Sequence, residues 1–395
     1  MEFIHYQTAL EQIFAKVPEP KLISVPLEKS IHFFTAENIL APIDIPVFDN
    51  SAMDGFGFCL ENLQSGMYYP VIGEIKAGAQ NIPPLLPGQA LKVFTGAPVS
   101  MDIKLVIPKE LCILKDDQVK IIAEHWEKGQ HIREKGTQSR KDEIIVPKNT
   151  KITPGLIGML ATFGIQNVLV YARPKMGVII TGDELAKPGT YLKPGQIYES
   201  NSLSLKALLK NENIEAEYVI HVQDDPEEMR NEIEKGLLKV DILLITGGIS
   251  VGDYDFVQKS LEDNGVEKIF YKIKQKPGKP LYFGIKDKTV IFALPGNPAS
   301  VFTCFLVYVK PFIHAFISGS SFFTFFRKGK ITHDFEKKSG LTHWLKAVET
   351  DGDVKILTGQ ESYKMSSFVE ANCLARLDEN TECIHKGSEL YYIKI

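Results

Sequence analysis

From residue 174 to residue 318 the sequence alternates short apolar runs with amphipathic segments, and this alternation restricts the possible fold more than any other feature. The apolar runs, which we expect to be strands, are Gly177–Ile180, Ala216–His221, Ile242–Ile245 and Val290–Leu294. The amphipathic segments, which we expect to be helices, are Ser202–Asn211, Pro226–Leu238, Phe256–Asn264 and Ala299–Ile317. Strands that alternate with helices build a parallel sheet with helices on both faces. The pattern therefore predicts a doubly wound α/β domain over residues 174–320.

Polar or glycine-containing motifs follow each predicted strand. They are Thr181-Gly182-Asp183-Glu184-Leu185, Gln223-Asp224-Asp225-Pro226, the Thr246–Asp255 loop and Pro295-Gly296-Asn297-Pro298. Because the carboxyl ends of parallel strands share one edge of the sheet, ligands bind in the crevice at that edge. Any one motif is equally compatible with a tight turn that binds nothing, but four at one edge favour a site. The candidate residues are Glu184, Asp224, Gly247, Gly248, Ser250, Asp255, Pro295 and Pro298.

The Thr246–Asp255 loop has the composition of a cradle for a phosphate or nucleotide. Gly247 and Gly248 allow a sharp turn and let the backbone approach a ligand without a Cβ in the way. Ser250 and Asp255 follow, and either side chain is able to cap the next helix. A strand, a glycine turn and a helix N-terminus together favour the binding of an anion.

A group of lysines lies between the Thr246–Asp255 loop and the last predicted strand, Val290–Leu294. Lys272, Lys274 and Lys276 alternate, which predicts that they share one face of a strand, and Lys279 follows a Pro-Gly turn. A solvated basic edge is the simpler interpretation. The functional one is a set of point charges for a phosphate or an oxyanion. Nearby carboxylates suggest a phosphate bridged by Mg²⁺, which binds one or two carboxylates and completes its shell with phosphate and water.

The remainder of the chain predicts further domains. Helical spacing over Gln7–Val17, Pro26–Leu40 and Ile152–Phe163 flanks a stretch of short β-type runs between residues 71 and 146. The tail from Lys328 is again β-like, and Thr350-Asp351-Gly352 predicts a hairpin. We therefore expect a helical domain in two segments (1–45 and 147–173), an inserted β-rich domain (46–146), the α/β domain (174–320) and a C-terminal β domain (328–395).

Charge and cysteine content restrict the class of protein. The formal net charge is −4, from 45 basic and 49 acidic residues, which gives no reason to expect a nucleic-acid or membrane-surface partner. Five scattered cysteines without a CxxC pair fit a reduced, cytoplasmic compartment and suggest no zinc site. The long apolar segment Val301–Ile317 contains Lys310-Pro311, so we expect a buried helix kinked at Pro311 and not a membrane span.

Six motifs in a fixed order resemble one known family, that of MoeA and the gephyrin E domain, the molybdopterin molybdenumtransferases. The motifs are Pro46-Val47-Phe48-Asp49-Asn50-Ser51-Ala52-Met53-Asp54-Gly55, Thr95-Gly96-Ala97-Pro98, Thr181-Gly182-Asp183-Glu184-Leu185, Gly247-Gly248-Ile249-Ser250-Val251-Gly252, Lys276-Pro277-Gly278-Lys279-Pro280 and Leu294-Pro295-Gly296-Asn297-Pro298. The resemblance implies that the tail is a β-barrel and that the protein is a homodimer with its cleft between subunits. It also implies the reaction, in which molybdate enters the dithiolene of adenylylated molybdopterin and AMP is released with Mg²⁺ present.

The resemblance also implies roles for individual residues. Glu184, Asp255, Lys276, Lys279 and Asp54 would be catalytic, and Glu184 and Asp255 would hold Mg²⁺. Asp54, Thr95 and Arg133 would face the pterin-nucleotide from the partner subunit. The residues expected to bind substrate are Thr95, Arg133, Asp224, Gly247, Gly248, Ser250, Lys272, Pro295 and Pro298. A molybdopterin adenylyltransferase is a further expected partner.

The sequence departs from the family pattern in the β-rich insert, and this keeps other functions open. Gly136-Thr137-Gln138 stands where the family usually has Gly-Glu-Asp, and Asp102-Ile103-Lys104 matches an acidic family position only loosely. One alternative is a non-catalytic molybdopterin-binding or scaffold protein on the same fold. Another is a molybdopterin adenylyltransferase, whose α/β domain would be similar, although the extra domains argue against it. Walker and GxGxxG motifs are absent from the sequence, which disfavours kinase and dehydrogenase chemistry.

Overall fold

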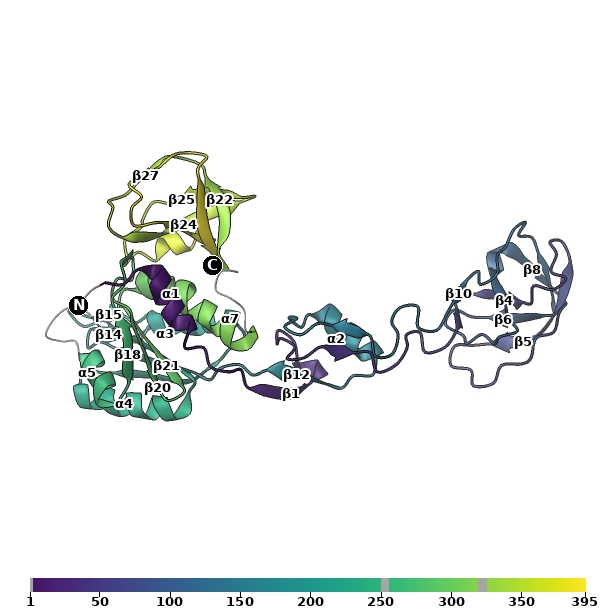
Figure 1. Cartoon of the computed structure of the whole chain (residues 1–395), viewed down its shortest axis with the longest axis horizontal. Helices are drawn as coiled ribbons and strands as arrows, with labels where there is room; N and C mark the ends of the chain where they lie inside the picture. Colours follow the sequence, from purple (N-terminus) through teal and green to yellow (C-terminus); the bar gives the residue numbers. More distant parts are fainter. Residues whose placement is uncertain (1–2, 250–255, 319–324) are drawn as a thin grey trace. The chain divides into compact units, whose positions relative to one another are not determined.

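The computed structural model describes residues 3–249, 256–318 and 325–395, and within it the chain forms two compact units (Figure 1). Unit 1 contains Met1–Ile23, His32–Phe34 and Val170–Ile395, and unit 2 contains Ser24–Ile31 and Thr35–Leu169. The first 23 residues thus group with the α/β region, whereas the sequence-based division assigned them to a helical domain. The four-domain division itself stays a prediction.

Unit 1 is built on a six-stranded sheet with the order β16-β13-β17-β21-β20-β18. Four strands are parallel, and their bounds match the predicted ones closely: β13 (Met176–Thr181), β16 (Ala216–Val222), β17 (Ile242–Thr246) and β21 (Thr289–Leu294). The sequence analysis did not predict β18 (Glu267–Tyr271) and β20 (Tyr282–Lys286), which extend the sheet in the antiparallel sense. The doubly wound α/β fold is confirmed, with an antiparallel pair at one edge.

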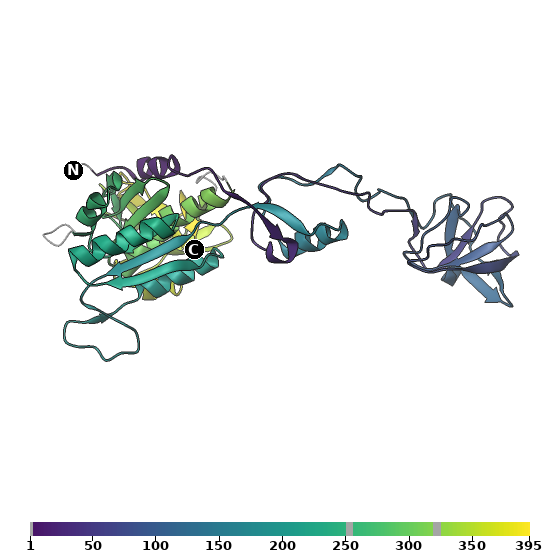
Figure 2. The ribbon, with the colours of Figure 1, turned by 90° about the horizontal axis from the view of Figure 1, so that it is seen from below.

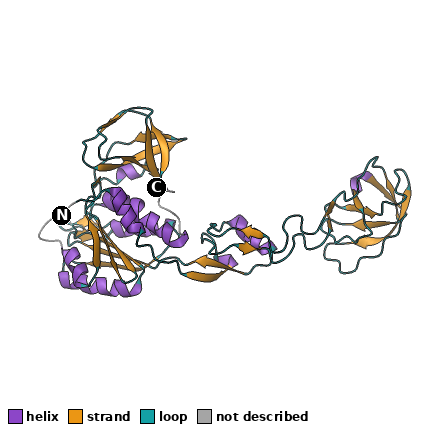
Figure 3. Ribbon diagram, viewed as in Figure 1, coloured by secondary structure: helices purple, strands orange, loops and turns teal. Residues whose placement is uncertain are grey.

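Helices cover both faces of this sheet (Figures 2 and 3). Successive side chains of a strand point to opposite faces, so Val178 and Ile180 of β13 join one core cluster and Ile179 joins the other. The first cluster also contains residues of α1 (Tyr6–Phe14), α3 (Asn201–Asn211), α6 (Pro298–Cys304) and α7 (Lys310–Ser318). The second contains residues of α4 (Pro226–Lys239) and α5 (Phe256–Asp263).

The helix from Pro298 to Ser318 is long and apolar enough to cross a membrane by length and composition, but 83% of its most apolar window is buried inside the protein. It is the core helix of the α/β region. A π-helical segment, Phe305–Val309, interrupts it and ends two residues before Pro311. The irregularity thus precedes the proline at which the sequence analysis expected a kink, where the missing N–H prevents a regular helical hydrogen bond.

The tail of the chain forms the predicted barrel. Five strands close on themselves because β24 pairs with both β25 and β26. They are β22 (Arg327–Ile331), β24 (Thr342–Thr350), β25 (Asp353–Ile356), β26 (Cys373–Leu377) and β28 (Glu389–Lys394). Asp351 and Gly352 have φ values of 50° and 89° and form the two-residue turn of the predicted hairpin. A short strand of the α/β region, β19 (Gln275–Lys276), pairs with the beginning of β24.

Unit 2 contains a six-stranded sheet with the order β7-β4-β6-β5-β9-β8, which confirms the β-rich character predicted for this part of the chain. Its strands are β4 (Gly55–Phe58), β5 (Tyr68–Ile75), β6 (Ala90–Val93), β7 (Leu105–Pro108), β8 (Cys112–Lys115) and β9 (Gln118–Ile121). Helix α2 (Pro154–Thr162) begins at a side-chain cap, where the Thr153 hydroxyl accepts a hydrogen bond from the Leu156 N–H at 3.3 Å.

The helix predicted for Pro26–Leu40 was wrong. This segment contains the end of β1 (Leu22–Pro26), a single 3₁₀ turn and β2 (Ile39–Leu40), and His32 has a φ of 66°. Its backbone bonds to distant residues instead of to itself: the Thr35 N–H donates to the Thr150 carbonyl and the Ala36 N–H to the Leu169 carbonyl, both at 3.0 Å. These tertiary bonds outweigh the local helical periodicity, which is a weak preference.

Candidate functional site

The carboxyl ends of the four parallel strands border a cavity of about 620 Å³ in unit 1. This volume is in the range typical of small-molecule sites. Every predicted strand-end motif contributes to its lining, through Thr181, Gly182, Glu184, Asp224, Gly247, Gly248, Pro295, Gly296, Asn297 and Pro298. Lys276 and Lys279 line the same cavity. Parallel topology thus gathers six candidate residues that are distant in sequence around a single space, and the two lysines bring the number on the cavity to eight.

The glycine turn after β17 is required by the packing of the protein itself. Gly247 has a φ of 91°, and a Cβ there would lie 2.3 Å from the carbonyl oxygen of Thr181. Gly248 has a φ of 61°, and its Cβ would lie 2.6 Å from Val257 Cγ2. The two glycines therefore let β17 approach β13 and α5, in addition to leaving backbone exposed at the cavity. Ser250 and Asp255 lie outside the described residues.

Two carboxylates on the cavity are positioned by short loops at the ends of β13 and β16. The Thr181 hydroxyl donates to Asp224 Oδ1 at 2.7 Å, and the Asp224 N–H donates to Asp183 Oδ1 at 3.0 Å. The carbonyl of Glu184 accepts from the Ile197 N–H at 2.8 Å. Asp225 caps α4, since its carboxylate accepts from the Glu228 N–H at 2.7 Å. The carboxylates of Glu184 and Asp224 thus both stand on the cavity wall, on residues exposed to solvent.

The lysines do not share one strand face, and that expectation was wrong. Strand β18 ends at Tyr271, Lys272 has a φ of 73°, and β19 is only two residues long. The Lys272 ammonium lies 4.8 Å from the centre of the Tyr271 ring, and Lys272 does not line the cavity. Lys276 and Lys279 are exposed on the cavity and place two positive charges there.

Sequence reasoning missed several residues of the cavity wall. Glu199 and Ser200 precede α3, and Asn201 is its first residue. Glu199 Oε1 accepts from the Ser202 N–H at 2.7 Å, and Asn201 Nδ2 donates to the Gly296 carbonyl at 2.9 Å. A polar run before a helix was the available signal for these three. Leu341 and Ser362 reach the cavity from the C-terminal barrel, and nothing local in the sequence marks them.

Unit 2 contains a second group of candidate residues, which we term the Asp54 corner (Asp54, Thr95 and Arg133). Asp54 Oδ1 accepts from both the N–H and the hydroxyl of Thr95, at 2.8 and 2.9 Å. Arg133 lies on β10 (Ile132–Arg133), which pairs with β3 (Asn50–Ser51), and the Ser51 N–H donates to the Ala97 carbonyl at 2.9 Å. Three segments that the sequence analysis singled out separately are therefore hydrogen-bonded neighbours.

The Asp54 carboxylate is held in its charged form. The pKa of Asp54 is lowered, first by the Thr95 N–H and then by the Thr95 hydroxyl, with a smaller contribution from the Lys109 ammonium 3.8 Å away. Arg133 is exposed. Thr137 and Gln138, the positions that depart from the family pattern, occupy an exposed turn in which the Thr137 hydroxyl donates to the Glu134 carbonyl at 2.9 Å.

The architecture described so far defines a class: a multidomain protein with a ligand cavity at the carboxyl edge of a doubly wound α/β sheet. Three family models match the chain in order. They are described as the MoeA N-terminal region (domain I and II) over residues 4–164, a probable molybdopterin binding domain over residues 177–315, and the MoeA C-terminal region (domain IV) over residues 328–395. The chain belongs to the MoeA family, which confirms the resemblance found in its motifs.

Relatives match over nearly the whole chain. Molybdopterin molybdenumtransferase of Staphylococcus epidermidis is 30% identical over 394 residues, which cover 98% of this chain and 94% of the relative. The enzyme of the same name from Haemophilus influenzae is 30% identical, with 91% of each chain covered. A crystal structure of the molybdopterin biosynthesis MoeA protein from Pyrococcus horikosii matches the fold with a TM-score of 0.85 at 27% identity, covering 100% of this chain and 99% of that one.

Proposed function

We propose that this protein is a molybdopterin molybdenumtransferase, which inserts molybdenum from molybdate into adenylylated molybdopterin and releases AMP. Relatives of this name, which match along nearly their full length, support the assignment to this step of molybdenum cofactor biosynthesis. The observation that carries the proposal is the cavity on which Lys276 and Lys279 stand with Glu184 and Asp224. Positive charge suits the phosphate and the molybdate oxyanion, while the carboxylates suit a cation bound between them.

The chain's own residues would act mainly by binding and orientation. Lys276 and Lys279 hold the oxyanion or the phosphate by charge, and they stabilise negative charge as the phosphorus–oxygen bond breaks. The backbone at Gly247 and Gly248 borders the phosphate region, and Pro295 and Pro298 form part of the wall. Asp255 and Ser250 complete this set in our proposal, as the resemblance implies.

The Glu184 carboxylate on the cavity fits a magnesium ion that would be shared with a substrate phosphate. Within residues 3–249, 256–318 and 325–395, no group of three or more His, Cys, Asp or Glu side chains forms a metal cage. Mg²⁺ needs only one or two protein carboxylates when phosphate and water supply the other oxygens. We propose Glu184 and Asp255 as its ligands, and the ion would neutralise charge on the phosphoanhydride.

Assembly and location extend the proposal. A homodimer would bring Asp54, Thr95 and Arg133 to the cleft of the partner subunit, as the resemblance implies. A molybdopterin adenylyltransferase, which would supply the adenylylated substrate, is the proposed partner protein. We place the protein in the cytoplasm, in agreement with its five cysteines, none of which is disulfide-bonded.

The decisive measurement is AMP release from adenylylated molybdopterin by the purified protein in the presence of Mg²⁺. We expect AMP only when molybdate is added as well. Bound substrate without AMP release would contradict the proposal and identify a binding or scaffold protein. Consumption of ATP with unmodified molybdopterin would instead identify an adenylyltransferase.

A further inference from the structure

Gln275 lies at the base of the loop that carries both cavity lysines. Its side chain is fully buried, and the residue is part of the cavity wall directly before Lys276. A buried amide must have its donor and its acceptor satisfied, because an unpaired polar group inside a protein is destabilising. The hydrogen-bond partners of this amide therefore indicate the structural role of Gln275.

The amide of Gln275 connects three parts of unit 1. Its Oε1 accepts a hydrogen bond from the Tyr308 hydroxyl and another from Trp344 Nε1, the latter at 3.2 Å. Its Nε2 donates to the carbonyl of Gly278 at 3.0 Å. Tyr308 belongs to the core helix, Trp344 to β24 of the barrel, and Gly278 lies between the two cavity lysines. Two donors on one side and a carbonyl on the other fix the orientation of the amide.

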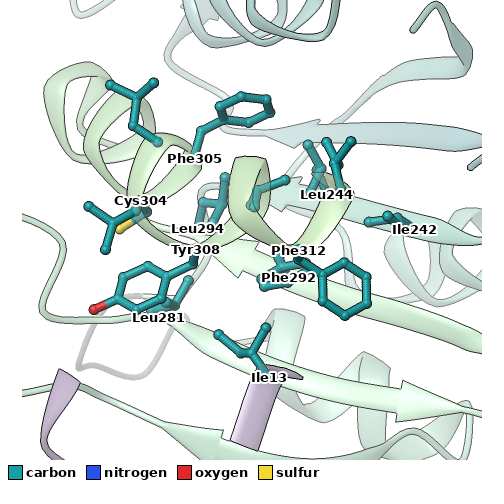
Figure 4. Packing of buried hydrophobic residues seen from close by; sticks show 14 of the residues in the cluster. Ile13, Ile242, Leu244, Leu281, Phe292, Leu294, Cys304, Phe305, Tyr308 and Phe312 are labelled. Atoms are coloured by element: carbon teal, nitrogen blue, oxygen red, sulfur yellow. The ribbon is translucent and has the colours of Figure 1, made fainter. Parts of the chain in front are cut away.

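The loop is packed firmly on the core helix at this point. Gly278 has a φ of 82°, and a Cβ there would lie 2.4 Å from Cys304 Sγ. The Ile273 N–H donates to the Lys279 carbonyl at 2.9 Å, which closes the loop on itself. Figure 4 shows Cys304 and Tyr308 on the same helical segment. Both side chains contact the Gln275 amide.

We propose that Gln275 is a positioning residue: by joining Gly278 to Tyr308 and Trp344, it fixes the loop that presents Lys276 and Lys279 to the cavity. A lysine carries its charge on a flexible stem, so the placement of its backbone decides how much freedom must be lost when an anion binds. The barrel thus helps to position the cavity lysines through the hydrogen bond of Trp344 to Gln275, although Trp344 itself does not line the cavity. The proposal relies on the proposed function only for the choice of the ligand in its second test.

The first test needs no ligand. Gln275→Leu removes all four hydrogen bonds of the amide at similar volume, including the weak one from Nε2 to Cys304 Sγ at 3.7 Å, and Tyr308→Phe removes only one of the four. Thr289→Val is the matched control, because this buried hydroxyl donates to the carbonyls of Leu237 and Val240 (3.2 and 3.0 Å) at the amino end of β21. Hydrogen exchange of residues 273–281 should accelerate about tenfold in Gln275→Leu, less in Tyr308→Phe and not in Thr289→Val.

The proposal would be overturned if hydrogen exchange of residues 273–281 were unchanged in both Gln275→Leu and Tyr308→Phe. It would also be overturned if Thr289→Val accelerated exchange in these residues as much as Gln275→Leu does. Tyr308→Phe keeps the test valid if Gln275→Leu fails to fold, since it leaves the amide and the Trp344 bond in place.

The second test asks whether Gln275 acts through the lysines, with AMP as the probe in calorimetry. Gln275→Leu should weaken AMP binding about tenfold in the wild-type background and about threefold or less in a Lys279→Ala background. Equal loss in both backgrounds would contradict action through the loop. Absence of AMP binding to the wild-type protein would count against the proposed function instead, and the exchange experiment would still decide the role of Gln275.

Discussion

The cavity of unit 1 and the Asp54 corner of unit 2 use their charged residues in opposite ways. On the cavity, Lys276 and Lys279 are exposed, and neither forms an ion pair with any residue in the described parts of the chain; the Lys279 ammonium lies 4.5 Å from the centre of the Phe3 ring. In the corner, the Asp54 carboxylate already accepts two hydrogen bonds from Thr95 and lies near Lys109. Charge is thus left available to a ligand in the first region, whereas it is used to hold a turn in the second.

This difference in charge pairing indicates that the cavity lysines serve ligand binding, whereas the Asp54 carboxylate serves the stability of the fold. Unpaired like charges at one place repel one another and are maintained at a cost to stability, which suits residues that must meet an anion. A carboxylate with internal donors contributes to folding and has less capacity for a new partner. If Asp54 contributes to catalysis, it does so from a position that the protein also uses structurally.

The largest expected effect comes from the glycine turn of the cavity. Gly247→Ala forces a Cβ to 2.3 Å from a backbone oxygen at a φ of 91°, whereas Gly96→Ala in the corner region, at a φ of 80°, finds its nearest atom at 3.9 Å. We expect Gly247→Ala to lower the free energy of unfolding by about 3 kcal/mol or more, and Gly96→Ala by about 1 kcal/mol. Chemical denaturation of both variants measures this, and equal losses would refute the packing explanation.

The parts of the site that sequence predicted are those fixed by local pattern and parallel topology. Glu184, Asp224, Gly247 and Pro295 each follow an apolar run, and a general rule places all such strand ends at one edge. The hairpin at Asp351 was equally predictable, because Asp-Gly between two apolar runs is a local sequence signal for a two-residue turn.

The features of the site that the sequence did not predict depend on contacts between residues that are far apart in the chain. Lys272 was expected on a continuous strand, but β18 ends before it and the chain adopts a positive φ there. The bonds of Gln275 to Tyr308 and Trp344 join residues 33 and 69 positions apart, so no local pattern reveals them. Leu341 and Ser362 reach the cavity only because the barrel packs beside the α/β sheet within unit 1.

An intermediate effect is expected from the exposed lysines of the cavity. Lys279→Ala should weaken AMP binding about 10-fold or more, because a charge on the cavity is lost, and should change stability by no more than about 0.5 kcal/mol. Lys109→Ala is the matched control in the corner, since this lysine is also exposed and lies 3.8 Å from a carboxylate. It should leave AMP affinity unchanged within about twofold. Similar losses of AMP affinity in both variants would mean that AMP binding depends on the net charge of the protein and not on a charge at the cavity.

The smallest effect concerns the charge of Asp54. Asp54→Asn keeps an oxygen for Thr95 but removes the negative charge, so the melting temperature should fall by only about 1 °C at neutral pH. The folded-state pKa lies below the ordinary value of 3.8, so the contribution of the charge is complete above that value and is lost as the pH falls through the lower folded-state pKa. The difference in melting temperature between wild type and variant should therefore stay constant above about pH 5 and disappear near about pH 2. A difference that persists in acid would show that the shape of the carboxyl group, and not its charge, holds the corner together.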